Sequence, residues 1–386
     1  MASRKIAEMP LHTGAAPAWL FQRMVEMAGA IGTLIVRDGG PLELMRRLSD
    51  PFWFQAFGCV LGFDWHSSGV TTTVCGAMKM AAKRYGADLG LAVCGGKGLT
   101  SRKTPGDIIT ACDRLGANPD GFIYASKMAA KVDNAAVQDG YNLYHHVFFF
   151  APGENAWSVV QQGMNLHNRQ ARRYHWLSEG TNNFISDPHT AIACDERRPA
   201  LNLVAGEGEA NRTSIASLAK EHPDRIMREI APLLKNDHLP LFDGLDKPLK
   251  KEKIDYRLPD RHSIDTSHIK PEALKKVLIK TYERQAENFE ALLGEPGIGP
   301  QAMRSLSLIS EIIFNAPASR RDPAAYSFAH GGKDGHPYEV NRKLYDANID
   351  RLRQAIDAAK LGNSDKVKAM RSLSEFTNRL TKAVPV

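Results

Sequence analysis

The spacing of apolar residues changes along this chain of 386 residues, and the change limits the folds that the chain can adopt. Residues 1–205 contain short apolar runs among glycine, histidine and aromatic residues, whereas residues 266–380 carry apolar side chains at intervals of three and four throughout. Short runs are typical of strands, and the second spacing is typical of helices. We therefore expect an α/β or α+β N-terminal domain over residues 1–205, a partly ordered polar connector over 206–265, and an all-α C-terminal domain over 266–386.

Two parts of the first domain give sharper predictions. The run LGLAVC (89–94) predicts a buried strand, and Thr104 is a suitable cap for the helix that follows. Farther on, YNLYHHVFFF (141–150) and WSVVQQG (157–163) flank the turn-forming PGEN (152–155). Two apolar runs around such a turn predict a β-hairpin.

Composition restricts the class of protein only loosely. Lys and Arg number 50 against 43 Asp and Glu, and this surplus permits a phosphate-rich partner without requiring one. The 5 cysteines form no CxxC pair, which favours a reducing compartment over a disulfide framework. The sequence contains no run of about 18 apolar residues, so we expect no membrane span. The first residues lack the apolar core of a signal peptide. We expect a cytoplasmic protein.

The most specific pattern lies at residues 281–314, where PGIGP separates two amphipathic helices. Gly297 and Gly299 permit a tight turn and close backbone approach, and Pro300 suits the first turn of the second helix. Unpaired N–H groups at a helix N-terminus favour phosphate. We predict that Gly297, Gly299 and Gln301 contact a nucleic-acid backbone without reading its sequence.

Residues 281–345 resemble the helix-hairpin-helix motif of DNA repair proteins, including the helix-hairpin-helix DNA glycosylases. The resemblance implies a grip on the nucleic-acid backbone. Glycosylases that form a Schiff base have a lysine in this hairpin, where this chain has Gln301. The stretch nearest to their catalytic Pro-Val-Asp is HPYEVNR (336–342), which has Asn341 and no Asp.

Motifs along nearly the whole chain resemble an uncharacterised family of bacterial and archaeal proteins, DUF763. This resemblance implies no particular activity. The motifs are PLHTG (10–14), DWHSSG (64–69), GGKG with SRKTP (95–105), AKVD (130–133), QDGYNLYHH (138–146), QQGMN (161–165), RRYHW (172–176) and DPH (187–189).

Side chains capable of catalysis gather in the predicted loops and strands of the first domain. The layout of Asp139 before one strand and Gln161 on the next resembles restriction-type nucleases, although their Asp/Glu-x-Lys is missing. We expect His145 and His146 to face opposite sides of their strand, so that at most one joins a given pocket. The predicted catalytic residues are Asp64, His66, Lys97, Lys103, Asp139, His145, His146, Gln161 and His175.

Separate loops also supply imidazole and carboxylate groups of the kind that bind Mg²⁺, Mn²⁺ or Zn²⁺. None of them shows close ligand spacing such as HxH or HExxH, so a structural role for each histidine is the alternative. The predicted metal ligands are Asp64, Asp133, Asp139, His175 and His189.

Two further segments carry basic residues that suit a phosphate backbone. RRYHW places Arg172 and Arg173 beside aromatic rings that can stack on bases. Lys333 lies in the glycine-rich stretch 327–340. The alternatives are a surface helix and an ordinary surface loop.

These patterns predict a nucleic-acid-binding protein, with DNA the expected partner, that acts as a phosphodiesterase in DNA repair. The alternatives are an accessory DNA-binding protein without catalysis and a glycosylase-like enzyme. Whether the chain is an enzyme depends on the folded geometry. Convergence of Asp64, His66, Asp139, His175 and one of the two adjacent histidines in one pocket would favour catalysis, and scattering would favour binding.

Overall fold

The computed structural model describes most of the chain, with gaps at several loops and at both ends. The predicted site residues Asp64, His66 and Lys333 lie outside the described residues. The described ranges are 18–62, 69–165, 170–181, 183–194, 197–235, 271–324, 342–359 and 362–383.

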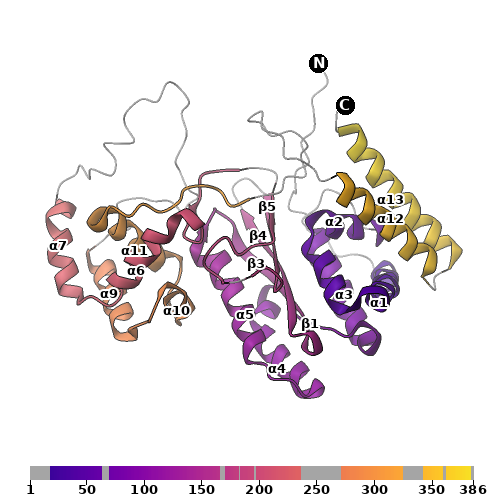
Figure 1. Cartoon of the computed structure of the whole chain (residues 1–386), viewed down its shortest axis with the longest axis horizontal. Coiled ribbons are helices and arrows are strands. Elements are labelled where there is room, and N and C mark those ends of the chain that lie inside the picture. Colours follow the sequence, from indigo (N-terminus) through magenta and orange to yellow (C-terminus); the bar gives the residue numbers. More distant parts are fainter. Residues whose placement is uncertain are drawn as a thin grey trace.

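An antiparallel sheet of five strands, in the order β1-β3-β4-β5-β6, lies at the centre of the molecule (Figure 1). The predicted hairpin is confirmed, because β3 pairs with β4 around the turn at Pro152–Glu154. The strand predicted at 89–94 is displaced toward the C-terminus, since β1 begins at Ala92. The strands are β1 (Ala92–Lys97), β3 (Asn142–Ala151), β4 (Ala156–Asn165), β5 (Gln170–Leu177) and β6 (Ala191–Ala193); a separate pair is β2 (Val137–Gln138) with β7 (Leu201–Asn202).

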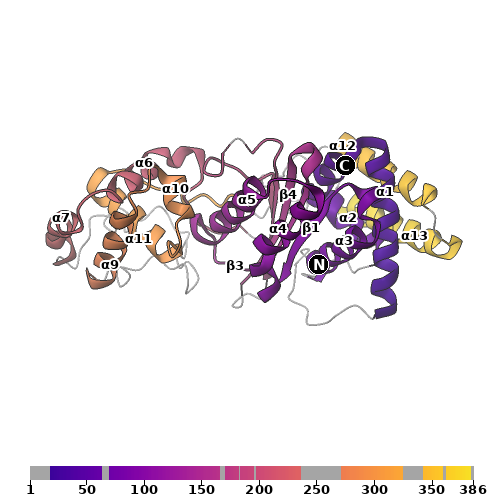
Figure 2. The same ribbon diagram turned by 90° about the horizontal axis from the view of Figure 1, so that it is seen from below.

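One face of the sheet is covered by the first three helices, whose apolar side chains form a single core with it. In both views the two last helices lie against this group, on the side away from the sheet (Figures 1 and 2). Arg351 of the later pair donates to Glu43 of the first helix. The helices are α1 (Ala18–Ser49), α2 (Pro51–Val60), α3 (Gly69–Leu89), α12 (Arg342–Ala358) and α13 (Asn363–Ala383). We call this side of the sheet the α1–α3 face.

The opposite face is covered by α4 (Thr104–Leu115) and α5 (Asp120–Lys131) and shares a second core with a further group of helices. We call it the α5 face. The further group lies at the far end of the molecule from α1 (Figures 1 and 2). It comprises α6 (Glu209–Leu218), α7 (Pro223–Lys235), α9 (Pro271–Arg284), α10 (Phe289–Gly294) and α11 (Pro300–Phe314).

The observed helices and strands can be compared with the fold class and the connector expected from the sequence. The mixed sheet and helices agree with the expected α/β or α+β class, and helices dominate the described residues after 271. Within the expected connector, residues 209–235 form α6 and α7, and 236–265 lie outside the described residues. The domain boundaries remain predictions. No described helix has the length and hydropathy that crossing a membrane requires.

Candidate functional site

Strand β5 distributes its polar side chains between the two faces of the sheet. Tyr174 and Trp176 lie on the α5 face with Arg172, where Trp176 joins the core shared with α5. Arg173 and His175 lie on the α1–α3 face, where they contact α2 and the end of α1. This alternation is the ordinary consequence of extended backbone. Groups adjacent in RRYHW therefore cannot act in one site.

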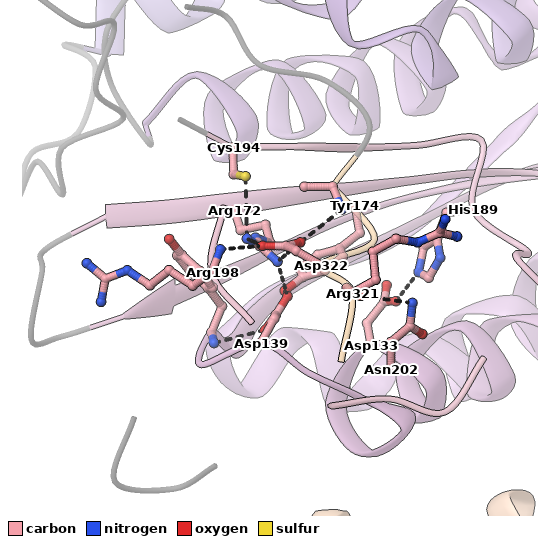
Figure 3. A network of polar contacts seen from close by, with 12 residues as sticks. Asp133, Asp139, Arg172, Tyr174, His189, Cys194, Arg198, Asn202, Arg321 and Asp322 are labelled. Carbon is pink, nitrogen blue, oxygen red and sulfur yellow. Dashed lines mark hydrogen bonds and ion pairs between the residues drawn. The ribbon is translucent and has the colours of Figure 1, made fainter. Parts of the chain in front are cut away.

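Arg172 is the centre of a buried ion network on the α5 face (Figure 3). Its guanidinium donates to Asp139 at 2.8 Å and to Asp322 at 2.8 Å. The hydroxyl of Tyr174 also donates to Asp139, at 2.7 Å. Burial disfavours the charge of Arg172, but the carboxylates of Asp322 and Asp139 outweigh it and raise the pKa of this arginine well above its usual value.

This network joins the helical group to the sheet. Asp322 follows α11 and also accepts from the backbone N–H of Arg198 at 2.9 Å (Figure 3). Close by, Ser319 forms an isolated β-bridge with Asn202. Arg172 is only 1% exposed, so the structure directs this predicted nucleic-acid contact inward.

Asp133 forms a second buried cluster beside the first. It lies in the π-helical turn η2 (Val132–Ala136), which continues α5. One carboxylate oxygen, Oδ2, accepts from the amide of Gln161 and from the indole N–H of Trp176. The other, Oδ1, contacts Nε2 of His189 (Figure 3). Burial raises the pKa of Asp133, and the contacts with His189 oppose that effect.

His146 extends this cluster toward α5. Its Nδ1 is 2.9 Å from Oε1 of Gln161, and its Nε2 is 2.9 Å from Oγ of Ser126. Because the amide nitrogen of Gln161 is directed to Asp133, Oε1 is the acceptor and Nδ1 of His146 donates. A neutral ring then accepts the hydroxyl proton of Ser126 at Nε2. Burial lowers the pKa of His146 to about 4, consistent with a neutral ring.

His189 has a different environment at each ring nitrogen. Nε2 contacts Asp133, whereas Nδ1 has no hydrogen-bond partner among the described residues and is not among the fully buried polar atoms. The ring packs on Trp176 with 4.3 Å between ring centroids. The carboxylate of Asp133 and the indole of Trp176 thus fix the orientation of the imidazole.

The α1–α3 face holds two further predicted histidines, His145 and His175. His145 is 2% exposed, and neither ring nitrogen has a hydrogen-bond partner. His175 places Nδ1 at 3.0 Å from the carbonyl oxygen of Leu48. Burial lowers the pKa of both histidines, that of His145 to about 3. Arg173 is buried here as well, with Nη2 at 3.1 Å from Oε1 of Gln55 and its guanidinium over the ring of Phe54.

The predicted metal ligands are therefore divided by the sheet. Asp133, Asp139 and His189 lie on the α5 face, and His175 lies on the other. Asp139 is engaged by Arg172 and Tyr174. In the described part of the chain, no group of three or more His, Cys, Asp and Glu residues is arranged to hold a metal ion. Metal binding therefore stays a prediction, and the described residues form no site for it.

A turn between α10 and α11 contains the predicted phosphate contacts. Gly297 has φ of 78°, and its carbonyl oxygen accepts from Nζ of Lys280 at 3.1 Å. Gly299 is the N-cap of α11, and no side chain caps that helix end. From α5, Lys131 donates to the carbonyl oxygens of residues 295 and 298, at 2.8 and 2.7 Å. Gln301 is exposed beside this turn.

The other predicted residues are placed apart from these clusters. Lys97 and Lys103 are exposed at the two ends of η1 (Gly98–Lys103), and the ammonium group of Lys97 lies 5.8 Å from the centre of the Tyr144 ring. Sequence reasoning did not include Ser126 in the site. It lies inside an ordinary amphipathic helix, where no local pattern indicates that its hydroxyl faces a histidine.

Comparison with known proteins gives one match. The family described as "Protein of unknown function (DUF763)" matches residues 5–340. No curated protein matches the chain, and no solved structure does. The family match covers most of the 386 residues and includes both the Asp133 cluster and the α10–α11 turn. The chain therefore belongs to the DUF763 family.

Proposed function

We propose that this protein binds a nucleic-acid backbone through the turn between α10 and α11. The observation that carries the proposal is the open N-terminus of α11. A helix of this length concentrates unpaired N–H groups and a partial positive charge at its first turn. Gly299 occupies the N-cap, and a Cβ atom built there would meet nothing within 4 Å. A phosphate group can therefore approach the backbone closely.

Two lysines support this turn from neighbouring helices. Lys131 and Lys280 donate to carbonyl oxygens of the turn and so fix its backbone. Their ammonium groups also add positive charge beside the helix end, and this charge favours an anionic ligand. The resemblance of this segment to the helix-hairpin-helix motif of DNA repair proteins is consistent with the same partner.

The predicted catalytic residues that the structure describes lie on both faces of the sheet and do not support a single nuclease centre made of them. His175 and His145 lie on the α1–α3 face, whereas Asp139, His146 and Gln161 lie on the α5 face. The described members of the predicted set thus do not converge in one pocket. Their separation by the sheet is consistent with a binding role for the protein.

Gly299→Asp tests the proposal, and Gly299→Asn is its matched control. A Cβ atom at this position meets no other atom within 4 Å, and both residues are favoured at the N-cap, so neither should destabilise α11. Only Asp adds negative charge where the phosphate would lie. We expect the Kd of Gly299→Asp for a fluorescent DNA duplex to be about tenfold higher than the Kd of Gly299→Asn, a difference of about 1.4 kcal/mol.

The measurement is fluorescence anisotropy with duplex DNA, single-stranded DNA and RNA at several salt concentrations. Affinity should fall as salt rises, because phosphate contacts release counterions. Equal affinity of the Asp and Asn variants for every probe would refute the proposed role of this turn.

A further inference from the structure

We propose that His189, oriented by Asp133, is the general base of a phosphodiester-hydrolysing centre on the α5 face. The inference rests on the proposed function in one respect, because it takes the phosphodiester to be that of a nucleic acid held at the α10–α11 turn. It adds a catalytic group that the binding proposal does not need.

The orientation of His189 is the first argument. A general base needs one nitrogen available to the reacting group and the other fixed by a partner that stabilises the protonated ring. Asp133 contacts Nε2, and Nδ1 has no partner among the described residues. The side chain is 7% exposed, so a small part of the ring reaches the surface while the rest is held in place.

The surroundings of Asp133 are the second argument. Its other oxygen is held by two neutral donors, Gln161 and Trp176, and Gln161 is itself fixed by His146. His189 is the ionisable side chain in direct contact with the carboxylate among the described residues. The negative charge of Asp133 is therefore available to stabilise an imidazolium on His189. The two neutral donors fix the position of the carboxylate without neutralising its charge.

The position of Asp133 in the chain connects this pair with the α10–α11 turn. Lys131, two residues earlier, holds the carbonyl oxygens of residues 295 and 298. Gln138, a few residues later, donates to the carbonyl oxygen of Pro300 at 2.8 Å. The same stretch of chain thus fixes both the turn and the carboxylate. The turn that is proposed to grip the backbone is therefore joined by side-chain contacts to the segment that carries Asp133.

The chemical step follows from this geometry. A water molecule attacks phosphorus, and Nδ1 of His189 takes the proton that the water loses. The new bond joins the water oxygen to phosphorus, and the bond from phosphorus to the leaving oxygen breaks. The leaving oxygen receives a proton from solvent. The products are a phosphate monoester and an alcohol, and His189 returns its proton to solvent.

The test measures turnover and binding in the same full-length variants. His189→Gln keeps an N–H donor in the place of Nε2, toward Asp133, but supplies no base. We expect it to lower kcat on labelled DNA and RNA oligonucleotides by about 100-fold or more, with Kd within about twofold of the wild type. His222→Gln is the matched control, because His222 is an exposed histidine that belongs to neither cluster. It should leave both quantities unchanged.

Two further measurements separate catalysis from a structural role. Added imidazole should restore part of the turnover of His189→Ala, because a free base can replace the missing one but cannot replace a packing contact. The small diester bis(p-nitrophenyl) phosphate should be hydrolysed in a His189-dependent manner even by Gly299→Asp, since it does not need the turn.

The outcomes are distinguishable. No hydrolysis by the wild-type protein of any of these substrates overturns the inference, and if binding persists, the proposed function stands. Wild-type turnover in His189→Gln also overturns it. A third outcome is a wild-type protein that does not bind oligonucleotides but hydrolyses the small diester in a His189-dependent manner. That outcome would support the catalytic role of His189 and refute the binding proposal.

Discussion

His145 and His146 are adjacent in sequence, equally buried and opposite in environment. His146 faces α5 and has a partner at each ring nitrogen, Ser126 and Gln161. His145 faces the helices of the other side and has a partner at neither. Burial lowers the pKa of both, to about 4 and about 3. The polar groups of the α5 face are thus connected to one another by hydrogen bonds. On the α1–α3 face, His145 is buried without any such hydrogen bond.

The comparison shows what decides whether a buried polar residue joins a network. Strand alternation assigns each side chain to a face, but the helix that covers the face supplies the partners. On the α5 face, α5 and η2 bring a hydroxyl and a carboxylate to the strands. We expect the α5 face to be the more sensitive of the two to polar substitutions, and the following predictions test that expectation.

The largest effect should follow from Arg172→Met. The variant leaves Asp139 and Asp322 buried without their shared cation. Removing one member of a buried ion cluster typically costs about 3–5 kcal/mol, and we expect a loss of unfolding free energy in that range. Urea unfolding monitored by circular dichroism measures it. Arg46→Ala, which breaks the exposed ion pair with Glu179, serves as the control and should cost less than about 1 kcal/mol.

The histidine pair sharpens the comparison. His146→Phe leaves Ser126 and the Oε1 of Gln161 without partners, at an expected cost of about 1–3 kcal/mol. His145→Phe removes two nitrogens that have no partner and breaks no hydrogen bond, so we expect a change within about 1 kcal/mol of zero. Urea unfolding at pH 7.5 compares them. Equal destabilisation by both would show that the two faces do not differ in this way.

The pH dependence of stability tests the lowered pKa values. In the unfolded chain both histidines bind protons near the ordinary pKa of 6.5, but in the folded protein they remain neutral until about pH 4 and about pH 3. Stability should therefore fall as pH falls below about 6.5, by up to about 1.4 kcal/mol per pH unit for each histidine. His145→Phe should show a shallower decline than the wild type between about pH 6 and pH 4. An unchanged slope would mean that His145 takes up a proton in the folded state.

The smallest effect concerns a neutral contact on the α1–α3 face. The hydroxyl groups of Ser49 and Ser158 are 2.9 Å apart, and Ser49 also contacts the carbonyl oxygens of Met45 and Trp176. Ser158→Ala leaves Ser49 with acceptors for its proton. We expect a cost of about 1 kcal/mol, the typical net worth of one hydrogen bond, without pH dependence. Thermal unfolding at pH 5 and pH 7.5 checks both statements.

The parts of the fold that could be predicted from sequence depend on near neighbours. The β3–β4 hairpin and the opposite directions of His145 and His146 follow from a turn signal and from strand alternation, which need no distant partner. The turn at Gly297 and Gly299 likewise follows from glycine between two amphipathic patterns. In each case the relevant interactions lie within a few residues, so the sequence contains them.

The partners of the buried charges could not be predicted in the same way. RRYHW reads as a basic-aromatic surface, yet the carboxylates that bind Arg172 come from positions 33 and 150 residues away. No local feature of Asp322 indicates that contact. The same holds for Asp133 and His189, which are 56 residues apart and contact each other, a contact that no local pattern indicates.

The packing of α12 and α13 against the first helices has a consequence for synthesis of the chain. The ion pair between Arg351 and Glu43 joins residues 308 positions apart, and apolar side chains such as Leu352 and Ile356 complete the core that α1 and α2 begin. On the ribosome, α1 and α2 emerge long before the segment that covers them. The part of their apolar surface that α12 and α13 cover stays uncovered until those two helices have been synthesised, and this side of the molecule completes its folding only then.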